Sequence, residues 1–222
     1  SYNMKHNEKN GWSNTDGDNN GNNWNCGAEG ETDDPEVEEL RRRMIKNACA
    51  TLMCSRGPAM FYAGDEFCNT QFGNNNSYCQ DNITSWLDWR LLEKNRDIFE
   101  FFKYMIRFRK SHRLLRTNVS NGVNGFPDVS FHGVIPWCEH FAGYDRYIGV
   151  MFTGQEKSSG PQFIYVASNA YWEEVEVLLP ELPISMCWKV VVDTWEESQK
   201  AYNLYSDRIT VRPRSLMVVL GE

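Results

Sequence analysis

The residues with the most suitable chemistry for binding a ligand lie between Gly64 and Asn82. Two carboxylates, Asp65 and Glu66, follow an apolar run, and a loop rich in amides starts at Gly73. Amides and carboxylates supply fixed hydrogen-bond donors and acceptors, and tyrosine and tryptophan rings can pack on sugar faces. We therefore expect a site for a ligand covered in hydroxyl groups, with candidate residues Asp65, Glu66, Asn74, Asn75, Asn76, Tyr78, Gln80, Asp81 and Asn82.

The same residues also allow a purely structural interpretation. Asp65 and Glu66 could cap the next segment, and the asparagines could satisfy turns in their own loop. Substitutions distinguish the two hypotheses. If the loop contacts the ligand, Asn75→Ala or Asp81→Ala should lower the efficiency of the complete protein and leave its melting temperature nearly unchanged.

An acidic stretch near the start of the chain, residues 16–21, matches the first half of an EF-hand loop, D-x-[DN]-x-[DN]-G. Its twelfth position is Gly27, so the bidentate glutamate that completes a calcium shell is absent. We interpret the stretch as an Asx-rich turn. The cysteines form no CxxC and the histidines no HExxH, so we expect no metal site.

The overall composition narrows the class of partner. The chain has 222 residues, a formal net charge of −7 and a sequence pI near 5.2, whereas proteins that bind nucleic acid or anionic lipid need clustered positive charge. The longest apolar runs are far shorter than the roughly 20 residues that cross a bilayer. Seven scattered cysteines suit a reducing compartment, so we expect a cytoplasmic protein with no nucleic-acid or membrane partner.

Hydrophobic periodicity predicts the elements that carry these residues. Residues 1–34 read as a long polar loop, which Trp12, Trp24 and Cys26 mark as ordered. One helix should begin at Pro35 and stop at Gly57-Pro58, and a second should run from Asn95 to about Arg116. Between them, the apolar run 59–63 is typical of a strand covered on both faces in a parallel sheet.

From residue 125 onward the period changes to 2, which indicates an antiparallel β-sandwich. The expected strands are 129–131, 147–152, 162–168, 175–179, 188–192, 208–211 and 216–220. A single buried parallel strand needs neighbours on both sides. We therefore interpret residues 1–124 as the last part of a larger α/β domain and residues 125–222 as a β-domain, so that this chain alone should not close a barrel.

The first half of the chain contains several long motifs, which are Ser1-Tyr2-Asn3, Lys5-His6-Asn7, Trp24-Asn25-Cys26-Gly27, Glu29-Gly30, Gly64-Asp65-Glu66, Gly73-Asn74-Asn75-Asn76, Tyr78-Cys79-Gln80-Asp81-Asn82 and Trp86-Leu87-Asp88-Trp89. In these motifs the chain resembles glycogen debranching enzymes of the isoamylase type, which belong to the α-amylase superfamily of glycoside hydrolases. Met4 and Arg56 depart from the residues common in that family. The resemblance implies no cofactor.

This resemblance implies that residues 1–124 are the last part of a (β/α)₈ TIM barrel followed by the β-sandwich. It implies a parent enzyme that hydrolyses α-1,6-glucosidic branch linkages in glycogen, limit dextrin or related α-glucans. His6 joins the candidate substrate-binding residues. The three catalytic carboxylates of the family should precede Ser1, so we expect this chain alone to be inactive and to need the remainder of the barrel as its partner.

Two other classes of function compete with this interpretation. The β-sandwich could be a carbohydrate-binding module that stacks sugars on its tryptophans, although Trp188 lies in an alternating strand that is typical of core. It could instead have a purely structural role and cover the last helix of the barrel, which is the reading we favour for this domain. Binding of α-glucan oligomers by the β-domain would discriminate between them.

Overall fold

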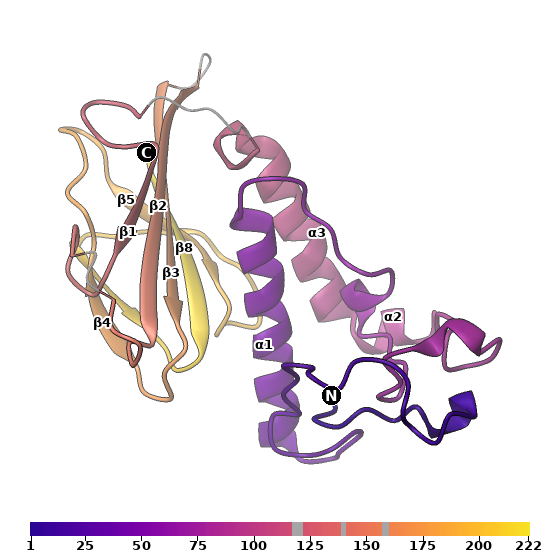
Figure 1. Ribbon diagram of the computed structural model, residues 1–222. Coiled ribbons are helices and arrows are strands. Elements are labelled where there is room, and N and C mark those ends of the chain that lie inside the picture. Colours follow the sequence, from indigo (N-terminus) through magenta and orange to yellow (C-terminus); the bar gives the residue numbers. More distant parts are fainter. Residues whose placement is uncertain (117–121, 139–140, 157–159) are drawn as a thin grey trace. The chain divides into compact units, whose positions relative to one another are not determined.

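The computed structural model describes residues 1–116, 122–138, 141–156 and 160–222 (Figure 1). The chain divides into two compact units. The first, here the loop unit, comprises Ser1–Ile45 and Phe61–Phe102, and the second, here the β-unit, comprises Lys46–Met60 and Lys103–Glu222. Among the described residues, no helix has the length and apolar character needed to cross a membrane.

The first predicted helix is confirmed as α1, Pro35–Cys54. The Asp34 carboxylate accepts hydrogen bonds from the backbone N–H of Glu36 and Val37, at 3.0 and 3.4 Å, and so caps the helix start as expected. The helix ends three residues before Gly57, whose φ of 101° no ordinary side chain adopts easily.

The second predicted helix is shorter than expected. A short helix α2, Leu91–Lys94, precedes α3, Arg96–Ser111, and a 3₁₀ turn η4 follows at Arg113–Leu115. The chain is extended at His112, with φ −113° and ψ 94°, so one continuous helix to Arg116 was wrong. Of the apolar stripe predicted for this helix, Ile98, Phe102 and Met105 are buried, and Phe99 and Ile106 are half-buried.

Arg109 of α3 has a role that its position near a helix end did not indicate. Its buried guanidinium donates to the carbonyl oxygens of Met53 and Ser55, both at 2.7 Å, and to that of Gly57. The Met53 carbonyl belongs to the last turn of α1, where a helix leaves acceptors unpaired, and those of Ser55 and Gly57 follow it. Arg109 therefore fixes the end of α1 within the β-unit.

The predicted buried strand at residues 59–63 is wrong for this structure. The segment has no regular secondary structure, belongs to no sheet and is exposed, with Met60 85% accessible. A parallel strand exists only when neighbouring strands satisfy its backbone groups, and none is beside this segment among the described residues. The described strands form one six-stranded and one two-stranded sheet and close no eight-stranded barrel.

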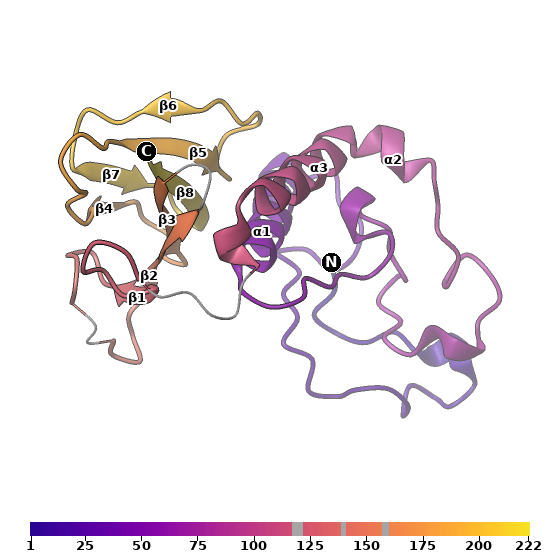
Figure 2. The same ribbon diagram turned by 90° about the horizontal axis from the view of Figure 1, so that it is seen from above.

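The β-unit contains all eight described strands, and every pairing is antiparallel (Figures 1 and 2). The larger sheet has the order β1-β2-β3-β8-β5-β6, and β4 pairs with β7 in the smaller one. Seven strands match the predicted positions. The eighth, β6, was missed because it is two exposed residues without alternation. The bounds are β1 Val129–His132, β2 Tyr147–Glu156, β3 Gly160–Asn169, β4 Val175–Leu178, β5 Trp188–Asp193, β6 Tyr202–Asn203, β7 Arg208–Val211 and β8 Ser215–Gly221.

One apolar cluster joins the two sheets. Phe163 and Tyr165 from the larger sheet share it with Val177 and Val211 from the smaller sheet, and all four are inaccessible to solvent. Trp188 belongs to the same cluster and donates from Nε1 to the Pro180 carbonyl at 2.9 Å, so its assignment to the core is confirmed. Each sheet thus buries one face on the other.

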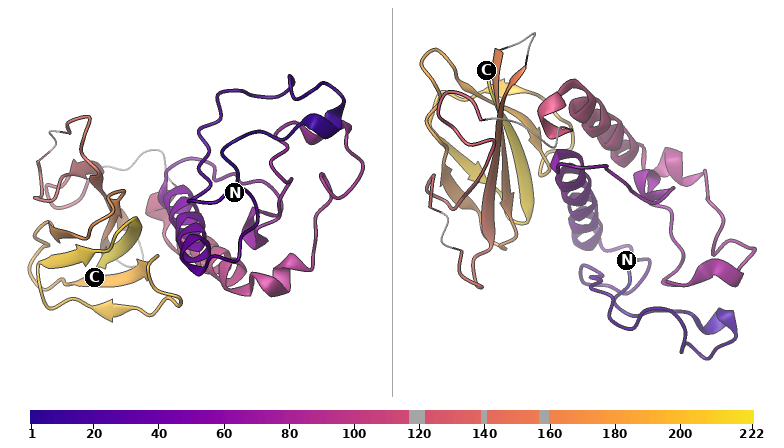
Figure 3. Two further views of the ribbon diagram at one scale, coloured as in Figure 1. Left: turned by 90° about the horizontal axis from the view of Figure 1, so that it is seen from below. Right: turned by 45° about the horizontal axis from the view of Figure 1, so that its top comes forward.

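The second halves of α1 and α3, which Figure 3 draws as ribbons, belong to this unit. Polar contacts attach both to it. Lys46 of α1 donates to the Glu196 carbonyl at 2.9 Å, and Tyr104 of α3 donates to the Val191 carbonyl at 2.7 Å. These bonds fix the later turns of α1 and α3 against the β5 side of the sheet. Arg56, one of the departures from the family pattern, pairs with Asp128 at 2.7 Å.

Candidate functional site

The loop unit joins two stretches of chain about 68 residues apart through paired asparagines. Asn7 is fully buried, and its amide donates to the Asn75 side-chain oxygen at 2.8 Å. The Asn75 N–H returns a bond to the Asn7 oxygen at 3.0 Å. The Asn75 amide also donates to the Asp18 carbonyl at 2.8 Å. The Asn75 side chain is therefore used in holding the two loops together.

A second set of amides surrounds Asn10. Its side-chain oxygen accepts from Asn74 at 2.9 Å and from Gln80 at 2.8 Å. Its amide donates to Asp16 at 2.8 Å, and Asn76 donates to the same carboxylate oxygen at 2.9 Å. The bond from Asn10, followed by that from Asn76, holds the pKa of Asp16 below its usual value although burial opposes them. We call Asn7, Asn10, Asp16, Asn74, Asn75, Asn76 and Gln80 the amide network.

Sequence reasoning found one half of this network and missed the other. Asn74, Asn75, Asn76 and Gln80 were predicted site residues, and the structure brings them together. Asn7, Asn10 and Asp16 were not predicted to partner them. The signal that could have found them is the high density of asparagine, glycine and aspartate in residues 1–34. We compared part of this stretch with an EF-hand loop and did not consider it as a partner of the amide-rich loop.

The last residues of the amide-rich loop divide into internal and exposed side chains. Asn82 donates to the Gln80 side-chain oxygen at 2.8 Å and accepts from the Thr84 N–H at 2.9 Å, so it closes a turn. Asp81 is exposed and accepts from the Trp86 indole N–H at 3.0 Å. Tyr78 is 75% accessible. Among the predicted residues of this loop, Tyr78 and Asp81 thus remain open to a ligand.

Asp65 and Glu66 lie in a 3₁₀ turn, Asp65–Phe67, that follows Gly64 at φ 101°. Asp65 accepts from the Tyr62 N–H at 3.0 Å, and Glu66 accepts from the Gly64 N–H at 2.8 Å. Desolvation raises the pKa of Asp65, with repulsion from Glu66 adding to it, against the lowering by the Tyr62 bond. Both carboxylates therefore bind backbone N–H groups of residues that precede them, and neither caps the segment that follows, so the capping interpretation was wrong.

His6 is held beside Glu29 and against the start of the amide-rich loop. Its Nε2 lies 3.2 Å from a Glu29 oxygen, and its backbone N–H donates to the Gly73 carbonyl at 2.8 Å. Bonds from the N–H groups of Asn3 and Met4 lower the pKa of Glu29 to about 2. Glu29 thus anchors the first residues of the chain, a role that sequence reasoning did not assign.

The EF-hand-like stretch forms turns. The Asp18 carboxylate accepts from the Asn20 N–H at 2.8 Å, which is an Asx-turn contact. In the described parts of the chain, no three or more His, Cys, Asp or Glu side chains are grouped so that they could hold a metal ion.

The loop unit carries many exposed aromatic rings. Trp12 and Trp24, which we took as residues of buried type, are 60% and 44% accessible, so only Cys26 of that trio is buried. Trp89 packs on Phe67, with ring centroids 5.2 Å apart, yet remains exposed. Flat exposed rings beside fixed hydrogen-bonding groups are suited to packing on apolar faces of a polar ligand. The other exposed rings are Phe61, Tyr62, Phe72, Tyr78 and Trp86.

Curated proteins with similar sequences are named glycogen operon protein, isoamylase and glycogen debranching enzyme. The glycogen operon protein homologue of Mycobacterium tuberculosis is 37% identical over 215 residues, and rice isoamylase 3 is 41% identical over 199 residues. These alignments include 87% and 89% of this chain. The chain is a homologue of the isoamylase-type debranching enzymes.

This homologue spans only a part of its relatives. It corresponds to 29% of the mycobacterial protein, 24% of rice isoamylase 3 and 26% of the Salmonella typhi glycogen debranching enzyme, to which it is 34% identical over 191 residues. No family model matches the chain.

Solved pullulanases have a similar fold. Pullulanase from Bacillus acidopullulyticus superimposes with a TM-score of 0.64 at 20% identity, covering 85% of this chain and 21% of that one. A pullulanase from Anoxybacillus, solved with maltotetraose, gives a TM-score of 0.60 at 20% identity, covering 82% and 24%. At this identity the likeness concerns the fold alone.

Proposed function

We propose that this chain is part of an enzyme that hydrolyses α-1,6-glucosidic branch linkages in glycogen or related α-glucans. The observation that carries the proposal is the similarity, over most of the chain, to proteins named isoamylase and glycogen debranching enzyme. The exposed aromatic rings of the loop unit support it, because α-glucans present apolar faces between their hydroxyl groups. A cytoplasmic location and the absence of a cofactor are part of the same proposal.

In this proposal, residues 1–124 are the last part of a (β/α)₈ barrel and residues 125–222 are a C-terminal β-sandwich. The exposed apolar segment 59–63 supports the first assignment, since neighbouring barrel strands would cover it. The shared core of the two antiparallel sheets supports the second. The remainder of the barrel is then the partner of the loop unit.

We assign the hydrolytic carboxylates to parts of the enzyme that precede Ser1. Retaining cleavage needs two carboxyl groups about 5 to 5.5 Å apart, one acting as nucleophile and the other as acid. Asp65 and Glu66 accept backbone N–H groups of their own turn, which is a contact expected of cleft-lining structure. They are therefore proposed to shape the cleft, and this chain alone is proposed to be inactive.

The substrate-binding proposal divides the predicted residues into two groups. Tyr78 and Asp81 are proposed to contact the glucan, with Trp86 held by Asp81. The remaining residues are proposed to act by fixing the loops that carry these groups, because their side chains bind other parts of the loop unit. This second group comprises His6, Asn74, Asn75, Asn76, Gln80 and Asn82.

A reducing-end assay tests this function. The protein of residues 1–222 and the longer protein encoded by the longest reading frame that contains it are incubated separately with a branched limit dextrin. We expect release from the longer protein and background from the chain alone. Asp65→Asn or Glu66→Gln in the longer protein should reduce the rate and not abolish it.

Two outcomes would contradict the proposal. Robust release by chain 1–222, lost in Asp65→Asn, would mean that the active carboxylates lie here. Binding of dextrin by the longer protein with no release would favour the alternative of a non-catalytic glucan-binding or structural module.

A further inference from the structure

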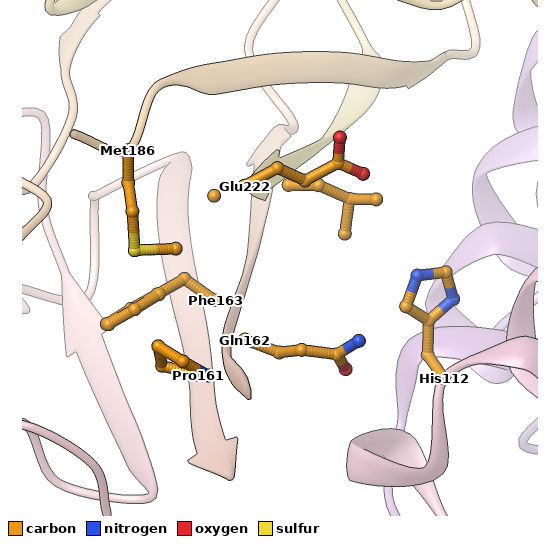
Figure 4. A pocket seen from close by; sticks show the side chains of 8 residues that line it. His112, Pro161, Gln162, Phe163, Met186 and Glu222 are labelled. Atoms are coloured by element: carbon orange, nitrogen blue, oxygen red, sulfur yellow. The ribbon is translucent and has the colours of Figure 1, made fainter. Parts of the chain in front are cut away.

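The β-unit contains a pocket of about 450 Å³, a volume within the range of small-molecule sites. It lies where the residue that follows α3 faces the start of β3 and the end of β8 (Figure 4). None of the proposed debranching contacts uses it. Its lining residues are His112, Pro161, Gln162, Phe163, Met186, Leu220, Gly221 and Glu222.

His112 supplies the pocket with a fixed hydrogen-bond acceptor. Its Nδ1 lies 2.7 Å from the Phe108 carbonyl oxygen, which only accepts, so Nδ1 carries the hydrogen of the neutral ring. Nε2 is then an acceptor. The imidazole also packs on the Phe108 ring, with centroids 4.2 Å apart, and the Gln162 side chain extends toward it (Figure 4). The orientation of Nε2 is therefore set before any ligand binds.

The opposite side of the pocket offers a carboxylate whose charge is offset. The Glu222 side chain lies 3.3 Å from Lys189 Nζ, so the pair presents oxygen acceptors with little net charge. Met186 and Leu220 add apolar lining to the pocket. Acceptors placed around an apolar surface suit a neutral ligand that has hydroxyl donors and a C–H face, and a paired carboxylate offers an anion no attraction.

We propose that this pocket binds a glucose unit of an α-glucan chain. The choice of sugar rests on the proposed function, while the preference for a neutral polyhydroxyl ligand rests on the lining. Because the substrate is a polymer, a second attachment point on the same protein raises the local concentration of chain segments. The β-unit would thereby contribute to glucan capture as well as to structure.

An NMR titration of chain 1–222 with maltotriose tests the proposal. With ¹³C-methyl methionine, we expect the Met186 resonance to shift on addition of the sugar. His112→Phe keeps a ring to pack on Phe108 and removes the Nε2 acceptor, so maltotriose should bind about 3- to 10-fold more weakly, as for the loss of one hydrogen bond. Circular dichroism checks that the variant is folded.

Trp172→Ala is the matched control, because Trp172 is an exposed ring of the β-unit outside the pocket. It should leave the affinity unchanged. An unmoved Met186 resonance at saturating maltotriose would overturn the proposal, and so would binding that Trp172→Ala abolishes and His112→Phe leaves intact. Such a failure is distinguishable from failure of the proposed debranching activity, which the reducing-end assay on the longer protein measures independently.

Discussion

Each of the two units is stabilised internally by a different kind of interaction. In the β-unit, apolar side chains from two antiparallel sheets share one inaccessible cluster. In the loop unit, side-chain amides bind one another across a long stretch of chain, and many aromatic rings remain exposed. An apolar core tolerates no loss of volume, whereas a hydrogen-bonded loop pair depends on each polar partner. Because side-chain amides hold the loop unit together, its exposed aromatic rings can contact a ligand or a partner.

Phe163→Ala should have the largest effect on stability. Phe163 is inaccessible within the shared cluster, and its truncation leaves a cavity that costs about 3 to 5 kcal/mol. Denaturant unfolding followed by circular dichroism measures the loss. Phe131→Ala, at an exposed position on β1, should change the free energy of unfolding by less than about 0.5 kcal/mol. Equal effects of the two changes would contradict a core shared by both sheets.

The β-unit should also lose stability in acid through His132. This imidazole is fully buried and accepts the Trp137 N–H at Nδ1 over 3.0 Å, while its Nε2 lies 2.8 Å from the Ser130 hydroxyl. Burial lowers its pKa from 6.5 to about 4. Because the folded state binds the proton less well than the unfolded state, the contribution is complete above pH 6.5 and declines as the pH falls toward 4.

The expected acid effect is up to about 3 kcal/mol between pH 7 and pH 4, from the size of the pKa shift. Unfolding free energies measured across this range test it. His132→Leu should be less stable at pH 7 and should show a flatter pH dependence. An unchanged slope in that variant would assign the acid sensitivity to other groups.

Asn75→Ala should distinguish the two interpretations of the amide-rich loop. The change removes the acceptor for Asn7 and the donor to the Asp18 carbonyl, and the buried Asn7 amide is left with an unmet bond. We now expect a loss of about 1 to 3 kcal/mol in the loop unit, in contrast to the unchanged melting temperature that a pure ligand contact predicts. Hydrogen–deuterium exchange of residues 1–45 and 61–102 during unfolding measures this unit separately. Asn22→Ala, at an exposed position, is the matched control.

Asp81→Ala should have the smallest effect on stability and should act on function. Asp81 is exposed and orients the Trp86 indole, so we expect a change in unfolding free energy within about 0.5 kcal/mol. In the complete enzyme, KM for branched glucan should rise about 2- to 10-fold, as for one lost hydrogen bond. Trp86→Phe keeps a ring and loses the N–H, so it should resemble Asp81→Ala. A large fall in melting temperature with unchanged kinetics would contradict this division of the loop.

The sequence alone determined the elements whose signals are local. The start of α1 was readable from Asp34 and Pro35, and seven strands of the β-unit were readable from alternation, because burial of one face imposes a period on the residues themselves. The core position of Trp188 followed from the same alternation. The amide-rich loop was also predicted from the sequence, because asparagine and glutamine are concentrated between Gly73 and Asn82.

Only the tertiary structure decided which distant groups meet. The bonds between Asn7 and Asn75 join positions 68 apart, and those of Arg109 reach the end of a different helix. Neither has a periodic signal, because a hydrogen bond requires only that two groups approach, whatever lies between them in sequence. The exposed segment 59–63 illustrates the same point. Its apolar residues predict a strand covered on both faces, but a strand forms only where neighbouring strands pair with its backbone, and the local sequence does not say whether they are present.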